Sequence, residues 1–349
     1  MATTMLLTDP LREVRAAVRE GRFREAASAL GALPGLVREV PEWHLLSAMT
    51  AWRLGDYRDS RDAALEARAR FRARGDADGE MRAENVAAAG AFGLGHLTAA
   101  EEEWSRAREL ARGLKDDLTV ARCSNNLGNI SLYLARHDAA HGFYRLARAG
   151  FERLGFAHGV AETWINTAIA WRDLGNFDEA AAAADSALEA AERTGSRRLL
   201  AEALSGRGAA MAALGDRVLG RMLVERGLAL AREDGDRLAE ADALRTLASI
   251  DHAAGRTADA ERISQLALAV AEALGHPWMV AEIQRERGTL LWDAPTRRTE
   301  AAACFAAAAA AFEQLGSTPR AERMRERAKA SQVRSSPLPP GSSASPSQA

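Results

Sequence analysis

Helix-ending signals that repeat every 40 residues are the strongest constraint on how this chain can fold. One series consists of Gly55, Gly95, Ala135, Gly175, Gly215 and Gly255. A second series lies halfway between and consists of Gly75, Lys115, Gly155, Gly195, Gly235 and Gly275. Glycine commonly ends helices because it adopts left-handed backbone angles without strain. Each 40-residue unit therefore divides into two segments, and we expect each segment to be a helix.

The apolar residues of these segments follow a helical period. Trp164, Ala168, Trp171 and Leu174 are spaced i, i+4, i+7 and i+10, which places them on one stripe of a helix. The alternation typical of strands is absent from the sequence. The pattern predicts antiparallel helix pairs that stack side by side.

The repeat resembles the tetratricopeptide repeat (TPR) family, whose pattern is W-x2-L-G-x2-Y followed by A-x3-F. In residues 121–160, Leu127 and Gly128 match the L-G pair, and Ala140 and Tyr144 match A-x3-F. The period exceeds the usual 34 residues and is similar to the long-helix subclass of Leu-Gly-Asn repeat adaptors and many bacterial regulators. The resemblance implies an all-α, right-handed superhelical solenoid of about eight antiparallel helix pairs.

This resemblance predicts one TPR-like helical repeat domain over residues 1–330. Its units are expected near 7–40, 41–80, 81–120, 121–160, 161–200, 201–240, 241–280 and 281–330. The remaining residues, 331–349, are rich in proline, serine and glycine, and we expect them to be disordered.

Charge and composition favour a cytoplasmic protein that binds neither nucleic acid nor membranes. The formal net charge is -2, which creates no strong field toward an anionic polymer. Cys123 and Cys304 lie far apart and form no CxxC pair, so we expect neither a disulfide framework nor a thiolate zinc site. The N-terminus lacks the pattern of a secretory leader, and the longest apolar tract, 301–312, is too short to span a bilayer.

No constellation of residues indicates catalysis. His137 and His141 are spaced i, i+4, but no third metal ligand is marked near them. The glycines of GAFGLGH do not follow a strand, and no nucleotide-binding or nucleophile motif occurs. We therefore expect no enzyme, no metal and no cofactor.

The implied architecture places the first helix of each unit along a concave groove. If units begin at 41, 81 and 121, their second, fifth, ninth and twelfth residues face inward. The segment SNNLGNI, residues 124–130, puts three asparagines on or beside this face, although asparagine is a mediocre helix former. Asn126 and Asn166 should be neighbours on adjacent helices about 8–10 Å apart. The predicted lining consists of Arg82, Asn85, Phe92, Arg122, Asn125, Asn126, Asn129, Ile165, Asn166, Ile169 and Arg172.

Such a lining suits an extended peptide that carries an acidic group. Carboxamides donate to and accept from a peptide backbone, and arginine binds a carboxylate in bidentate fashion. We therefore predict an adaptor that binds a peptide segment of another protein. The asparagines could instead bond to neighbouring helices and hold the stack in register.

Two other functional classes stay open. One is a regulatory sensor subunit whose superhelix responds to a small peptide or metabolite and controls a separate output protein. The other is a self-associating scaffold, which the molar mass in solution would test.

Residues 201–240 carry four glycines within predicted helices, namely Gly206, Gly208, Gly220 and Gly227. Each interior glycine costs roughly 0.5–1 kcal/mol relative to alanine. The sequence therefore predicts a soft joint in this unit, and close packing of a partner against these glycines is the other explanation.

Overall fold

A computed structural model describes residues 9–333, and every regular element in this range is a helix. The predicted all-α repeat fold is confirmed for these residues. The structure forms two compact units, one ending at Ala239 and the other beginning at Glu240. The single repeat domain expected for residues 1–330 stays a prediction. The last described helix reaches Val333, and the rest of the predicted disordered tail lies outside the described residues.

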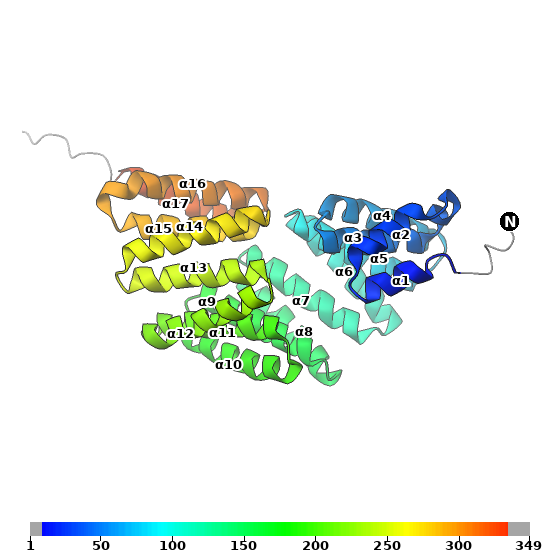
Figure 1. Cartoon of the computed structure of the whole chain (residues 1–349), viewed down its shortest axis with the longest axis horizontal. Coiled ribbons are helices and arrows are strands. Elements are labelled where there is room, and N and C mark those ends of the chain that lie inside the picture. Colours follow the sequence, from blue (N-terminus) through cyan, green and yellow to red (C-terminus); the bar gives the residue numbers. More distant parts are fainter. Residues whose placement is uncertain (1–8, 334–349) are drawn as a thin grey trace, which may run out of the picture. The chain divides into compact units, whose positions relative to one another are not determined.

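The first unit contains six consecutive helix pairs, in which neighbouring helices run in opposite directions (Figure 1). Their bounds are α1 (Arg12–Arg19), α2 (Phe23–Ala32), α3 (Pro41–Leu54), α4 (Tyr57–Ala73), α5 (Ala77–Gly93), α6 (Leu97–Leu114), α7 (Asp117–Tyr133), α8 (His137–Arg153), α9 (Ala157–Asp173), α10 (Phe177–Thr194), α11 (Arg197–Ala213) and α12 (Arg217–Glu233). A short 3-10 helix, η2 (Gly35–Glu39), precedes α3.

The second unit continues the same alternation. Its helices are α13 (Arg237–Ala253), which begins just before the division between the units, α14 (Thr257–Ala273), α15 (Pro277–Trp292), α16 (Arg298–Gln314) and α17 (Thr318–Val333). The irregular sequence DAPTRRTEAA forms the 3-10 helix η3 (Pro295–Arg297) and the start of α16.

All twelve predicted helix breaks have positive φ angles. Ten of them are glycines, for which this left-handed conformation is unstrained. The other two are Lys115, with φ of 59°, and Ala135, with φ of 56°. A side chain in this conformation costs roughly 1–2 kcal/mol because Cβ approaches the following carbonyl oxygen. The repeat therefore imposes the same turn on each of the six units from 41 to 280, even where the sequence does not supply glycine.

Replacing Lys115 or Ala135 by glycine should raise the free energy of unfolding by about 1 kcal/mol each, because the turn loses its steric strain. Gly55→Ala is the matched control. Its φ is 90°, no atom lies within 4 Å of an added Cβ, and the substitution should lower stability by a similar amount. Urea denaturation measures all three, and a destabilised Ala135→Gly variant would contradict this account.

Polar side chains cap the first helices of the pairs at the same 40-residue spacing. Asp76, Asp116, Ser196 and Asp236 each accept a hydrogen bond from the backbone N–H three residues later. These bonds satisfy backbone donors that have no partner within the helix. The caps extend α5 and α7 to begin four residues before the unit starts expected at 81 and 121.

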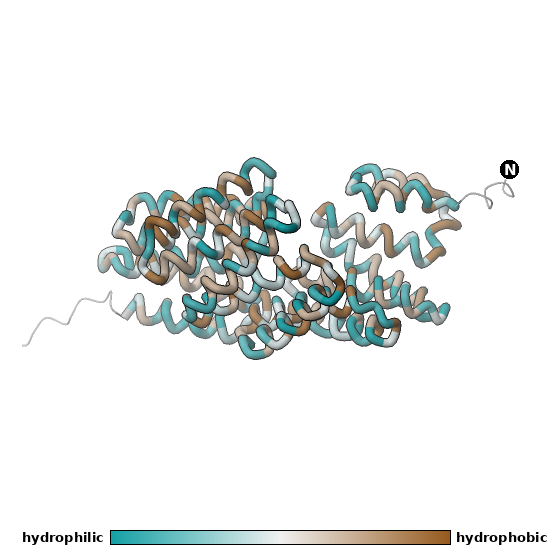
Figure 2. Tube along the Cα trace, turned by 90° about the horizontal axis from the view of Figure 1, so that it is seen from below, coloured by the Kyte–Doolittle hydropathy of each residue, from teal (hydrophilic) through white to brown (hydrophobic). Residues whose placement is uncertain are grey.

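Small residues form the contacts between helices of a pair. Ala100, Ala140, Ala180 and Ala260 are spaced 40 apart and are almost completely buried, and Gly220 occupies the corresponding position of α12. Hydrophobic and hydrophilic segments alternate along the helices in Figure 2, as expected where one side of each helix packs against a neighbour.

The glycines of residues 201–240 bring α11 and α12 close together. A Cβ added to Gly208 would lie 2.5 Å from the carbonyl oxygen of Gly220, and one added to Gly220 would lie 2.6 Å from that of Gly208. A Cβ on Gly227 would lie 2.7 Å from the carbonyl oxygen of Ala201. Gly206 alone of the four has no atom within 4 Å. Close packing within the helix pair explains three of these glycines, so they do not require a soft joint.

Candidate functional site

The predicted lining residues lie on α5, α7 and α9, the first helices of three successive pairs. They are Arg82, Asn85 and Phe92 on α5, Arg122, Asn125, Asn126 and Asn129 on α7, and Ile165, Asn166, Ile169 and Arg172 on α9. The two arginines Arg82 and Arg122 are exposed, Asn125 and Ile165 are buried, and the others are partly buried. We call Asn85, Asn125, Asn126, Asn129 and Asn166 the asparagine face.

Hydrogen bonds from the asparagine face connect neighbouring helices. Asn166 donates through Nδ2 to Oδ1 of Asn125 at 3.1 Å, which joins α9 to α7. Trp104 of α6 donates through Nε1 to Oδ1 of Asn85 at 3.1 Å. Asn166 was expected beside Asn126, but its bonded partner is Asn125, 41 residues away. Packed helices cross at an angle, so contacting side chains need not occupy equivalent repeat positions.

Gly128 and Asn129, both within SNNLGNI, hold the ring of Tyr144 from α8. A Cβ on residue 128 would lie 2.4 Å from Cε1 of Tyr144, so glycine is needed for the ring to lie there. The tyrosine is completely buried, and its hydroxyl donates to Oδ1 of Asn129 at 2.8 Å. Burial raises the pKa of Tyr144 well above its ordinary value, so the phenol stays a neutral donor. Part of this motif therefore positions a buried core residue.

Replacing Asn129 by alanine should lower the free energy of unfolding by about 1–2 kcal/mol, because the buried hydroxyl of Tyr144 loses its acceptor. The matched control is Asn126→Ala. Asn126 is partly buried and makes no hydrogen bond in the described part of the chain, so its loss should change stability by less than about 0.5 kcal/mol. Adding Tyr144→Phe to Asn129→Ala should recover part of the loss in a thermal melt. Equal stability of the two single variants would contradict a role for this bond.

Each bonded asparagine uses only part of its hydrogen-bonding capacity. Among the described residues, Nδ2 of Asn125, Nδ2 of Asn129 and Oδ1 of Asn166 have no partner, and none of these atoms is sealed from solvent. The bonds to the scaffold fix the orientation of the carboxamides. The same side chains therefore connect helices and keep donors and acceptors open to a ligand.

The two exposed arginines of the predicted lining are weakly compensated. Arg122 makes no ion pair among the described residues, and its guanidinium lies 5.4 Å from the ring centre of Phe156. The carboxylate paired with Arg82 belongs to Asp78, on the same helix and 3.9 Å away. Such exposed pairs contribute roughly 0–1 kcal/mol, so both cations can bind another anion at little cost.

The apolar members of the predicted lining pack against neighbouring helices. Phe92 stacks on Tyr133 with ring centres 5.5 Å apart, which joins α5 to α7. Ile165 belongs to a buried cluster formed by residues of α7, α8, α9, α10 and α11, and Ile169 packs against this cluster. These residues support the positions of α5, α7 and α9 beneath the polar side chains.

A charged cluster connects α9 to α11. It includes Glu162 and Glu202, which occupy the second position of the units that start at 161 and 201. Arg198 donates to Glu162 at 2.8 Å and to Glu202 at 2.6 Å. The carboxyl of Glu202 is largely surrounded by protein, although its side chain is still partly exposed. Burial raises the pKa of Glu202 to about 7, and the ion pair with the positively charged Arg198 acts on the pKa of this carboxyl in the opposite direction.

The histidine pair singled out in the sequence is engaged with α9. Nε2 of His137 lies 2.7 Å from Oδ2 of Asp173, and the ring of His141 lies against Trp171 with centres 3.9 Å apart. Within residues 9–333, no three His, Cys, Asp or Glu side chains gather in an arrangement that could hold a metal ion.

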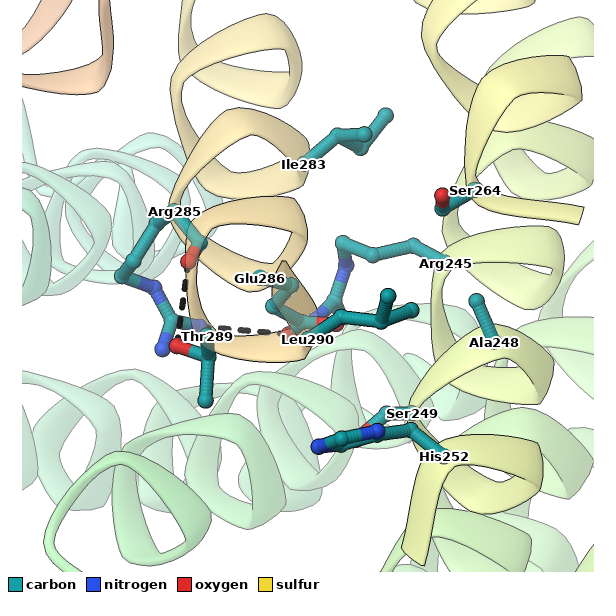
Figure 3. Close-up of a pocket in the computed structure, with 10 residues that line it drawn as sticks. All are labelled: Arg245, Ala248, Ser249, His252, Ser264, Ile283, Arg285, Glu286, Thr289 and Leu290. Carbon is teal, nitrogen blue, oxygen red and sulfur yellow. Dashed lines mark hydrogen bonds and ion pairs between the residues drawn. The ribbon is translucent and has the colours of Figure 1, made fainter. Parts of the chain in front are cut away.

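The second unit contains a pocket between α13 and α15 that the sequence analysis did not single out (Figure 3). Its volume is about 140 Å³. The register used above, applied to units starting at 241 and 281, selects five of its lining residues, which are Arg245, Ser249, His252, Arg285 and Thr289. The signal that could have found this pocket was therefore the repeat register itself.

Charges inside this pocket are compensated by one another (Figure 3). The buried Arg245 forms an ion pair with Glu286 and donates to Asp242 at 2.7 Å. Arg285 donates to Glu286 at 3.2 Å and to Glu282 at 2.9 Å. Burial raises the pKa of Glu282, but the neighbouring arginines outweigh it and hold the pKa below its ordinary value. The pocket therefore offers little net charge to a ligand.

Two polar atoms of the pocket residues have no hydrogen-bond partner within residues 9–333. They are Nδ1 of His252 and Oε2 of Glu286, and both are sealed from solvent. The other ring nitrogen of His252 lies 3.0 Å from Oδ2 of Asp293.

Together these features define an all-helical repeat scaffold of the TPR type. No family model matches the sequence, and no curated protein matches it. Among the described residues, no helix is long and apolar enough to span a bilayer.

Solved structures match the fold over nearly its whole length. A Rap protein complexed with competence and sporulation factor is 14% identical, with a TM-score of 0.63 over 93% of this chain and 96% of that one. NprR in complex with its cognate peptide NprX is 13% identical, with a TM-score of 0.61 over 93% and 97%. Aspartyl phosphate phosphatase F from Bacillus subtilis is 11% identical, with a TM-score of 0.53 over 94% of each chain. At these identities the similarity establishes the fold.

Proposed function

We propose that this chain is a non-enzymatic protein that binds an extended peptide segment through the asparagine face, while Arg82 and Arg122 bind an acidic group of that peptide. The carrying observation is that the carboxamides are oriented by bonds to the scaffold and still have unpaired atoms open to solvent. Preorganised groups of this kind lower the entropic cost of binding. They suit a peptide main chain, which offers donors and acceptors in alternation.

Comparison with similar structures supports a peptide ligand. NprR, which has the same fold over almost its entire length, binds its cognate peptide NprX. This chain and NprR share 13% identity, so the support lies in the scaffold and does not extend to particular residues. A peptide or protein partner, in place of nucleic acid or a membrane, also fits the formal net charge of -2.

An adaptor for another protein and a sensor of a small peptide differ in the consequence of binding. An adaptor needs only affinity, whereas a sensor must change conformation in response to its ligand. Hydrogen exchange separates the two, because a sensor should show altered protection in helices outside α5–α9 when a peptide is bound. The sensor is the second candidate function, because the similar NprR structure contains its cognate peptide.

We also propose that this chain has no catalytic activity, although one of the similar structures is named a phosphatase. Burial raises the pKa of Cys123 to about 12, which keeps its thiol protonated and unsuited to nucleophilic attack at neutral pH. Phosphate release from acetyl phosphate in the presence of the full chain should remain at the uncatalysed rate. A rate that rises in proportion to protein concentration would contradict this part of the proposal.

A displayed library of random octapeptides tests the binding proposal on the full chain. We expect enrichment of peptides that carry aspartate, glutamate or a free C-terminal carboxylate. The double variant Arg82→Gln, Arg122→Gln should bind the enriched peptides at least tenfold more weakly, as measured by fluorescence anisotropy. Asn126→Ala should also weaken binding without changing the melting temperature.

Arg112→Gln is the matched control, because Arg112 is an exposed arginine on the second helix of a pair and contacts Glu109 on its own helix. This variant should bind the peptides as the unmodified chain does. Enriched peptides that bind equally well to the double variant would show that the asparagine face is not the peptide site.

A further inference from the structure

The second unit contains another pocket beside the one in Figure 3, and the two pockets differ in the side chains that line them. Its volume is about 520 Å³, and Thr289 of α15 lines both pockets. Trp292 of α15 and Phe305 of α16 give it an aromatic wall, with ring centres 6.4 Å apart. The last described helix, α17, adds Arg323 and Arg327, which lie four residues apart on one face of the helix.

The arginines of the two pockets differ in their electrostatic compensation. In the smaller pocket, Arg245 and Arg285 share the carboxylate of Glu286. In the larger pocket, Arg323 and Arg327 have no carboxylate within ion-pair distance in the described part of the chain. Asp293 and Glu326 also line the larger pocket, but neither forms an ion pair with these arginines, and Asp293 lies 3.0 Å from Nε2 of His252. The second unit therefore contains arginines that are paired with carboxylates in one pocket and, in the neighbouring pocket, arginines that form no such pair among the described residues.

The guanidinium of Arg327 is held in place by neutral groups. It donates through Nη1 to Oγ1 of Thr289 at 2.9 Å and lies 5.2 Å from the ring centre of Phe305. Burial lowers the pKa of Arg327, and the positive charges of Arg285 and Arg323 lower it further. An anion placed between Arg323 and Arg327 relieves this repulsion and accepts charge-assisted hydrogen bonds.

We propose that this pocket is a second binding site and that it takes a carboxylate attached to an aromatic or aliphatic group. The carboxylate is bound by Arg323 and Arg327, and the apolar group lies against Trp292 and Phe305. Thr289 orients Arg327 through its hydroxyl. A cavity of 520 Å³ accommodates a group the size of one amino-acid residue with its neighbouring peptide unit. The C-terminal residue of a peptide and a free apolar carboxylic acid share this chemistry.

This site is independent of the proposed peptide binding by the first unit. Its residues belong to α15, α16 and α17, except for Asp293, which directly follows α15. A failure of the asparagine face to bind peptides therefore leaves this inference intact, and the converse also holds.

Calorimetric titration of the full chain with N-acetyl-phenylalanine tests the site. We expect saturable binding that is at least tenfold weaker for N-acetyl-phenylalaninamide, which lacks the carboxylate, and for inorganic phosphate, which lacks the apolar group. Phenylacetate distinguishes the two sources of the ligand. Binding as tight as that of N-acetyl-phenylalanine supports a free acid, and weaker binding supports a peptide terminus.

Variants of α17 locate the site. Arg323→Gln combined with Arg327→Gln should reduce the affinity for N-acetyl-phenylalanine at least tenfold, with an unchanged circular dichroism spectrum. Arg325→Gln is the matched control on the same helix, because Arg325 forms an ion pair with Glu313 and does not line the pocket. The variant Arg82→Gln, Arg122→Gln should bind this probe as the unmodified chain does.

Three results would overturn the inference. They are no saturable binding of N-acetyl-phenylalanine to the unmodified chain, equal binding of its amide, and equal affinity in the double variant of α17. The first two need no variant, so the test stands even if the double variant does not fold.

Discussion

The double variant Arg68→Ala, Arg106→Ala should have a free energy of unfolding about 3 kcal/mol lower than the unmodified chain, because a carboxylate inside the first unit loses its principal counterions. That carboxylate belongs to Glu84 of α5, which is completely buried. Arg106 donates to it from α6 at 3.0 Å and Arg68 from α4 at 3.4 Å. Arg72 lies 3.8 Å away and remains in the double variant, so the expected loss is at the lower end for a broken buried pair.

The reciprocal substitution separates lost charge pairing from lost packing. Adding Glu84→Met to the arginine double variant removes the uncompensated charge, and it should restore most of the stability lost in urea denaturation. Arg112→Ala is the control, since its exposed pair with Glu109 should contribute less than about 1 kcal/mol. A triple variant that is less stable than the double variant would show that the arginine side chains act through packing.

The second large effect is expected from Gly208→Ala, which should lower the free energy of unfolding by about 2–3 kcal/mol. The added methyl group would lie 2.5 Å from the carbonyl oxygen of Gly220 and 2.6 Å from Cγ2 of Val224. Backbone cannot move aside as a flexible side chain can, so α11 and α12 must separate. The loss of close packing should exceed the gain in helix propensity that alanine brings.

Gly206→Ala is the matched control because it lies on the same helix two residues away and has no atom within 4 Å of an added Cβ. This variant should be more stable than the unmodified chain by roughly 0.5–1 kcal/mol. Opposite signs for the two substitutions in a thermal melt would establish that packing, not flexibility, explains Gly208. Stabilisation by both would favour the soft joint.

The asparagine face shows which features of a site can be predicted from the repeat positions alone. The register correctly places its residues on the first helices of successive pairs, because helix breaks and apolar stripes recur at a constant period. It could not reveal that Asn129 accepts a bond from Tyr144 or that Asn166 bonds to Asn125. These partners depend on the angle and offset between packed helices, which a one-dimensional period does not contain.

The pockets of the second unit were missed for a different reason. Arg245, Arg285 and Thr289 occupy positions that the same register selects, but charged residues in a sequence look alike whether they are paired or not. Their carboxylate partners include residues 41 positions away, as in the pair of Arg245 with Glu286. Net charge around a pocket is a property of the folded arrangement, so no local pattern indicates which arginines remain available to a ligand.

The sequence by itself determined the helical fold and the places where its helices end, because these follow from local backbone preferences repeated along the chain. The turns at Lys115 and Ala135 show that the period prevails even over an unfavourable residue. Only the tertiary structure decided that Gly208 and Gly220 face each other, that Glu84 is buried among arginines, and that Arg327 forms no ion pair with a carboxylate among the described residues. Each of these depends on contacts between helices, and their energies arise from distances that exist only after the helices have packed.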